Sequence, residues 1–186
     1  MSIQVTFPIA GHHERDSGAV YNGRQENKET IKIRETLALS LQKIGIKVIK
    51  DKDNQTLSEV LRTIKPGRGS VLYDSHLNAS TDATATGTEC VVSNESYANR
   101  DNSYRMAEEI CEVASKLLGI RNRGVIPESK TARKRLAILH TKAGISVVHE
   151  WCFISNSNDM KALDENMSRA CEAIAKILKK YDDLIT

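Results

Sequence analysis

Runs typical of strands alternate along the chain with apolar residues at helical spacing, and this order limits its fold more than any other feature. Short runs rich in apolar and β-branched residues predict strands at 3–7, 46–50, 70–73, 87–92, 135–140 and 145–151. Apolar residues at helical spacing predict helices over about 26–44, near 57–64, around 106–117 and from about 158 onward. Strands that alternate with helices are typical of an α/β fold. We therefore expect a mostly parallel sheet of about six strands with helices on both faces.

The segments between these runs supply the expected boundaries. Gly45, Pro66-Gly67 and Gly119 stand where the predicted helices should end. Residues 11–24 and 121–133 are polar and are expected to be loops. The run at 145–151 is almost entirely apolar, which predicts a central strand.

Length and charge narrow the class of protein. A chain of 186 residues is expected to form one compact domain over residues 1–186. The net charge of +3 is spread along the chain and aromatic residues are only 4%, which argues against a nucleic-acid partner. No apolar stretch is long enough to span a bilayer. The N-terminus does not resemble a signal peptide, so we expect synthesis in a cytoplasm.

The four cysteines lie far apart and form no CxxC pair, which argues against a cysteine zinc site or a dithiol motif. Free buried thiols are the expectation for all of them, namely Cys90, Cys111, Cys152 and Cys171.

Polar side chains gather where three predicted strands end. The groups are His12-His13-Glu14, Asp74-Ser75-His76 and His149-Glu150. Ligands of α/β proteins collect at such strand ends. Two strand-end histidines and a carboxylate at the start of the long helix would form a zinc set that leaves a position open for water. Histidines also occur often in structural roles, so the residue pattern alone leaves open both a catalytic metal site and structural histidines.

The order of the motifs resembles that of the zinc-dependent N-acetylmuramoyl-L-alanine amidases, which are cell-wall hydrolases of phages and bacteria. The similar segments, in chain order, are 11–19, Glu26, 75–79, 87–89, 123–125 and 150–156. The resemblance extends from about Ile3 to Leu163.

This resemblance implies a role for each matching residue. His12, Glu26 and His76 correspond to the zinc ligands, and Glu150 corresponds to the catalytic carboxylate. The implied cofactor is Zn²⁺, and the implied partner is bacterial peptidoglycan. The bond implied is the amide between N-acetylmuramic acid and L-alanine.

Departures from the family pattern leave several assignments open. Ile9-Ala10 replaces an acidic residue and a proline before the first ligand, so the partner of His12 is either missing or supplied by Asp16 or Asp74. His13 is an alternative ligand to His12. His149 is expected on the opposite face of its strand from Glu150, in a structural role.

Other polar residues have two interpretations each. Asn78 and Asn156 match polar family residues beside the site, although hydrogen bonds that shape loops would also explain them. Arg123 is a candidate contact for the stem peptide or a solvated loop residue. His140 is expected at a strand end in a structural role, with a place near the substrate groove as the alternative.

The function expected from these residues is zinc-dependent hydrolysis of the cell-wall amide bond by a monomer, with release through a holin as one route to the wall. The alternatives are a zinc peptidase or carboxypeptidase acting on the stem peptide, and a non-catalytic wall-binding protein of the same fold.

Overall fold

The computed structural model describes residues 5–64, 70–95, 99–141 and 143–184. Its strands are β1 (Val5–Ala10), β2 (Val20–Tyr21), β3 (Arg24–Gln25), β4 (Ser70–Asn78), β5 (Thr88–Val92), β6 (Asn122–Pro127) and β7 (Ile145–Phe153). Its α-helices are α1 (Glu26–Lys43), α2 (Leu57–Thr63), α3 (Arg100–Leu118) and α4 (Ser157–Leu184), and two 3-10 helices are η1 (Glu128–Lys130) and η2 (Ala137–His140).

The main sheet has five strands in the order β1-β4-β7-β5-β6. The pairs β1–β4, β4–β7 and β5–β6 are parallel, whereas β5 and β7 are antiparallel. The predicted α/β class with a mostly parallel sheet is confirmed, and β7 is central as expected.

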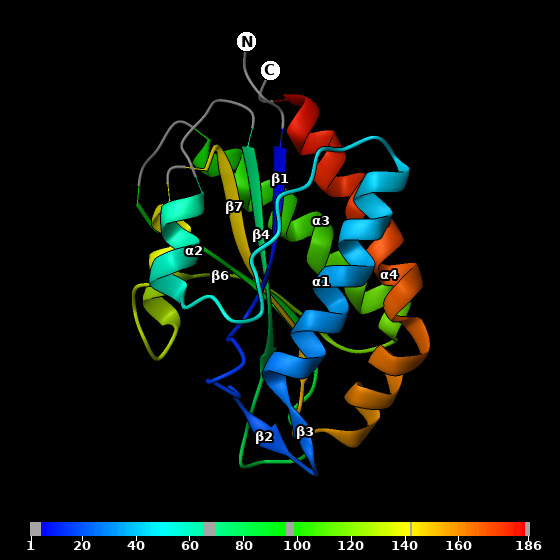
Figure 1. The fold of residues 1–186 in the computed structure, drawn as a ribbon. Helices are drawn as coiled ribbons and strands as arrows, with labels where there is room; N and C mark the ends of the chain where they lie inside the picture. The colour runs from blue at the N-terminus through cyan, green and yellow to red at the C-terminus, as the bar shows by residue number, and fades with distance from the viewer. Residues whose placement is uncertain (1–4, 65–69, 96–98, 142, 185–186) are drawn as a thin grey trace.

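Helices cover both faces of this sheet unequally. The long helices α1, α3 and α4 lie on one face, and α2 lies on the other (Figure 1). Alternation along β4 divides its side chains, because Val71 and Tyr73 enter the core beneath the long helices while Leu72 enters the core shared with α2 and η2. Among the described residues, no helix is both long enough and apolar enough to cross a bilayer.

Three element predictions were wrong. Residues 46–50 form no strand, because only a bridge between Thr6 and Val48 joins them to the sheet. Residues 135–140 contain η2, which buries the adjacent residues Ile138 and Leu139 in the same core, whereas a strand would turn them to opposite faces. The predicted loop 121–133 contains β6 and η1.

Smaller differences concern turns and ends. The predicted loop 11–24 includes β2, which pairs with β3 in a hairpin. Strand β6 has polar, partly exposed residues because it is an edge strand, and a register shift opposite Gly124 interrupts its pairing with β5. The predicted helix stop at Pro66-Gly67 and the first residues of the strand predicted at 3–7 lie outside the described residues.

Candidate active site

A cavity of about 750 Å³ lies at the edge of the sheet, on the face that carries α2. It is lined by His12, Glu26, Asp74, His76, Asn78 and Glu150, together with apolar residues of the smaller core and with residues 130–133 and 135–138. Three of these side chains, Asp74, His76 and Asn78, occupy alternate positions of β4 and therefore point to the same face.

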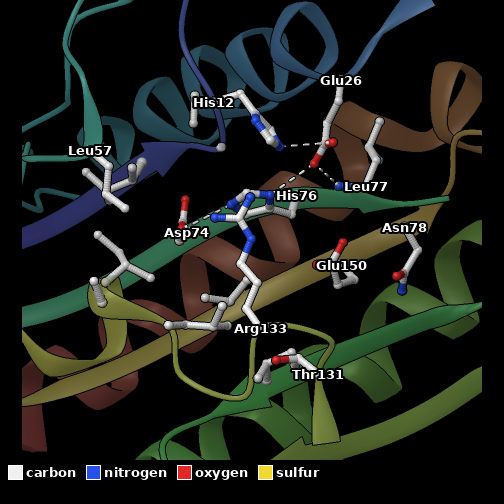
Figure 2. Close-up of a pocket in the computed structure, with 18 of the residues that line it drawn as sticks. His12, Glu26, Leu57, Asp74, His76, Leu77, Asn78, Thr131, Arg133 and Glu150 are labelled. Carbon is white, nitrogen blue, oxygen red and sulfur yellow. Dashed lines mark hydrogen bonds and ion pairs between the residues drawn. The ribbon is translucent and has the colours of Figure 1, made fainter. Parts of the chain in front are cut away.

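His12, Glu26 and His76 converge at one end of this cavity (Figure 2). His12 Nε2 lies 3.1 Å from Glu26 Oε2, and His76 Nδ1 lies 3.0 Å from Glu26 Oε1. One potential ligand atom from each residue lies within 4.8 Å of the other two. Two imidazoles and one carboxylate form a donor set that suits zinc and leaves coordination positions open.

Local structure explains why these three residues meet. β1 and β4 are parallel neighbours, and the Gly11 backbone N–H donates to Ser75 O just beyond the end of β1. Glu26 is the first residue of α1, and its two carboxylate oxygens accept hydrogen bonds from the backbone N–H groups of Ala19 and Leu77. The backbone thus orients the carboxylate before any cation is present.

Each histidine of the cluster has a second carboxylate. His12 Nδ1 lies 3.0 Å from Asp16 Oδ2, and His76 Nε2 lies 3.3 Å from Asp74 Oδ2. A carboxylate on the far ring nitrogen fixes the tautomer and the orientation of a metal-binding imidazole. Of the two candidates, Asp16 is therefore the carboxylate partner of His12, and Asp74 is the partner of His76.

The field at the cluster is strongly negative. Burial alone would raise the pKa of Glu26, but hydrogen bonds from His12 and His76 hold that pKa well below its usual range. Burial would lower the pKa of His76, but Asp74 and Glu26 raise it well above the usual value. Burial also opposes positive charge on His12, but Glu26 and Asp16 raise its pKa. An environment that favours positive charge on both imidazoles also favours a bound cation.

Two glycines make room for the cluster. A Cβ at Gly11 would lie 2.5 Å from Cε1 of His76, and one at Gly18 would lie 2.5 Å from Oε2 of Glu26. Gly18 also has a positive φ of 62°, a conformation that favours glycine. His12 itself has a φ of 68°, so the loop after β1 turns sharply at the first histidine.

Glu150 lies beside the cluster on the central strand β7, opposite His76 in the β4–β7 register. Its carboxyl group faces the cavity in Figure 2. Its Oε2 atom is buried and has no hydrogen-bond partner among the described residues. Burial raises the pKa of Glu150 to about 7. A carboxyl group that titrates near neutrality can both accept and donate a proton there.

The remaining histidines lie outside the cluster. His13 lines the cavity, but its Nδ1 accepts a hydrogen bond from the Arg15 backbone N–H. His149 is fully buried on the opposite face of β7 from Glu150, where it contacts Tyr73 and Thr88, and burial lowers its pKa to about 3. His140 lies in η2, at 2.9 Å from a Glu128 carboxylate oxygen, and not at the end of a strand as predicted.

The three candidate substrate residues differ in position. Asn78 lines the cavity and donates from Nδ2 to Glu89 Oε1. Arg123 pairs with Glu89 at 2.9 Å, outside the residues that line the cavity. Asn156 directly precedes α4 and accepts hydrogen bonds from the backbone N–H groups of Asn158 and Asp159. The structure therefore brings only Asn78 into the cavity, and substrate contact by Arg123 or Asn156 stays a prediction.

The sequence analysis gave no role to the basic side chains at 130–135 that line the cavity, because residues 121–133 were interpreted as a polar loop and residues 135–140 as a strand. The density of Lys and Arg there, KTARKR, was the signal that could have identified it.

The fold and this cluster place the chain among α/β enzymes with a candidate metal centre. A family model described as N-acetylmuramoyl-L-alanine amidase matches residues 9–180. The chain belongs to the N-acetylmuramoyl-L-alanine amidase family.

Individual relatives agree with this assignment. The N-acetylmuramoyl-L-alanine amidase LytC of Bacillus subtilis (strain 168) is 28% identical over 176 residues, which are 92% of this chain and 34% of LytC. The chain thus spans about a third of that relative. The crystal structure of N-acetylmuramoyl-L-alanine amidase from Clostridium difficile 630 has the same fold, with a TM-score of 0.81, 22% identity and 98% coverage of both chains. The putative N-acetylmuramoyl-L-alanine amidase from Neisseria meningitidis gives a TM-score of 0.76 at 25% identity, covering 95% of this chain and 94% of that one.

Proposed function

We propose that this chain hydrolyses the amide bond between the lactyl group of N-acetylmuramic acid and the first L-alanine of the stem peptide in bacterial peptidoglycan. The proposal assigns Zn²⁺ to His12, Glu26 and His76, and proton transfer to Glu150. It takes residues 1–186 as one catalytic domain. Synthesis in a cytoplasm, holin-type release and action as a monomer stay predictions.

The observation that carries the proposal is the position of Glu150 beside the three converging ligand candidates. Its Oε2 atom is buried without a partner, and the pKa of the carboxyl group is raised to about 7. A buried carboxylate oxygen without a partner costs stability, so its presence beside a cavity points to a function.

Each group has a defined task in this mechanism. His12, Glu26 and His76 hold the ion, and Asp16 and Asp74 hold the two imidazoles in the ligating tautomer. A bound zinc ion supplies Lewis acidity for the scissile carbonyl and for the activation of water. Glu150 accepts a proton from the attacking water and returns it to the leaving amine nitrogen. The hydroxyl group of the water ends on the carbonyl carbon, so the products are a lactyl carboxylate and a free L-alanine amine.

The metal assignment is tested by zinc content. Wild type should contain about one zinc ion per chain, lose turbidity-clearing activity on purified cell walls with a strong chelator, and recover it with added zinc. His12→Ala should lose zinc, and His13→Ala, the matched neighbour, should keep it. The reverse result would assign the first ligand to His13.

The assignment of Glu150 is tested by Glu150→Gln, which preserves size and removes proton acceptance. The variant should keep its zinc and its fold but lose activity by roughly 10²–10⁴-fold, the usual contribution of positioned acid–base catalysis. Full activity in this variant would contradict the mechanism. Absence of wall hydrolysis by zinc-loaded wild type would instead favour the non-catalytic wall-binding protein.

A further inference from the structure

A basic segment forms the wall of the cavity across from the metal cluster. Residues 130–135 carry four cationic side chains, and three of them, Lys130, Arg133 and Arg135, line the cavity. Figure 2 shows Thr131 and Arg133 across the cavity from His12 and Glu26, with the Arg133 side chain extending into the space between. The cavity therefore has an acidic side that suits a cation and a basic side that suits an anion.

Among the described residues, no ion pair neutralises the charge of Arg133. Arg135 forms an ion pair with Glu95, whereas Arg133 has no ion pair in the described part of the chain. Two carboxylates that line the same cavity have other cationic partners, because Asp74 contacts His76 and Glu89 contacts Arg123. An unpaired guanidinium that faces a cavity offers a planar set of donors that matches a carboxylate.

The segment that presents Arg133 is anchored at both ends. The buried Glu128 accepts hydrogen bonds from the Leu136 backbone N–H and from Ser93 Oγ, and it lies 2.9 Å from His140 Nε2. The Thr131 backbone N–H donates to the Glu128 carbonyl oxygen. These contacts restrain the segment before a ligand arrives, which lowers the entropy cost of binding.

The lining of the cavity also includes apolar side chains, namely Leu57, Val60, Leu136, Ile138 and Val148. A cavity that combines apolar side chains with a guanidinium suits a ligand that combines short alkyl groups with an anionic group. A peptide of small residues with a free carboxylate has this chemistry, whereas a polyphosphate has no alkyl groups for the apolar side chains.

We propose that Arg133 is a specificity residue that binds a free carboxylate of the stem peptide while the scissile amide lies at the metal cluster. The carboxylate in question is the α-carboxylate of the second stem residue, a glutamate that occurs in free or amidated form. This inference rests on the proposed amidase function and deepens it, because it distinguishes between two forms of the same substrate.

The test uses two soluble muramoyl peptides that differ only at the second residue, one with a free α-carboxylate and one with a carboxamide. Release of L-alanine amino termini gives kcat/KM for zinc-loaded wild type, Arg133→Gln and Lys134→Gln. Lys134 is the matched control, because it is the next cation of the same segment but does not line the cavity.

Wild type should prefer the free carboxylate by roughly tenfold, the magnitude expected for one charge-assisted contact. Arg133→Gln should lose that preference by slowing the carboxylate substrate alone, and Lys134→Gln should keep it. Equal rates of wild type on both substrates, or an unchanged preference in Arg133→Gln, would overturn the inference and leave the amidase function standing. If wild type cleaves neither substrate, the result contradicts the proposed function and therefore also the inference.

A second experiment distinguishes a peptide carboxylate from a cell-wall phosphate as the anion that Arg133 binds. Cell walls with and without phosphate-bearing polymers are digested by wild type and Arg133→Gln. A defect of the variant on both wall types supports the peptide carboxylate. A defect confined to phosphate-bearing walls would assign the Arg133 site to phosphate and overturn the proposal.

Discussion

Gly18 offers a sharp test of the metal cluster, because its replacement by alanine puts one atom between two ligand candidates. A Cβ at this position would lie 2.5 Å from Glu26 Oε2 and 2.6 Å from His12 Cδ2. Ordinary contact begins near 3.4 Å, so the neighbouring atoms would have to move by roughly 0.9 Å. Metal–ligand distances tolerate only about 0.2 Å, so this displacement should disrupt the zinc set.

Backbone strain must be separated from this local clash. Gly18 has a φ of 62°, and an alanine in the left-handed region costs about 1–2 kcal/mol. Gly23 supplies the control, because its φ is 77° and a Cβ there meets no atom within 4 Å. Gly23→Ala therefore reports the strain alone, in the same segment of the chain.

We expect Gly18→Ala to lower zinc affinity by roughly 10–100-fold, the range seen when the support of a metal ligand is removed. Gly23→Ala should bind zinc as wild type does, with a similar loss of about 1–2 kcal/mol in the free energy of unfolding of the metal-free protein. Competition with a chromophoric chelator measures the affinity, and urea unfolding measures the stability. Wild-type affinity in Gly18→Ala would refute the assignment of His12 and Glu26 to one metal site.

Three further predictions concern other parts of the structure. Asp74→Asn should lower zinc affinity by about tenfold or more in the same chelator competition, since His76 loses the carboxylate on its second ring nitrogen; unchanged affinity would show that Asp74 does not support the ligand. Burial would raise the pKa of Glu128, but hydrogen bonds from Leu136, His140 and Ser93 hold it below the usual 4.5. The ionised form of Glu128 therefore stabilises the fold above about pH 4.5, and this stabilisation is lost as the pH falls. The free energies of unfolding of wild type and Glu128→Gln, measured in urea, should therefore converge in acid. A difference that stays constant with pH would count against this explanation. Thiol titration should detect no reactive cysteine in the folded protein and four after unfolding, because all four are buried and free; native reactivity would contradict their burial.

The sequence alone was enough to predict the α/β class, since apolar runs of strand and helix length alternate along it. The motif resemblance also selected the residues that converge in the structure, because β1 and β4 are parallel and bring His12 and His76 to the same sheet edge. The register of β4 against β7 then places Glu150 opposite His76.

What sequence reasoning could not supply depends on tertiary contacts. Residues 135–140 have the composition of a strand, but Glu128 binds the Leu136 backbone and η2 buries Ile138 and Leu139 together. Strand β6 has too few apolar residues to be recognised, because it pairs only with β5 at the sheet edge. The choice between Asp16 and Asp74 as the partner of His12 depends on a turn whose geometry no spacing rule describes.

The position of the cut bond tests the central claim most directly. Purified peptidoglycan is digested with zinc-loaded wild type, and the new chemical ends are identified by amino-terminal labelling and by reducing-sugar assay. The proposed function predicts new L-alanine amino termini, no new reducing sugar ends and intact glycan chains. New D-amino-acid termini would contradict it and identify the chain as a zinc peptidase of the stem peptide.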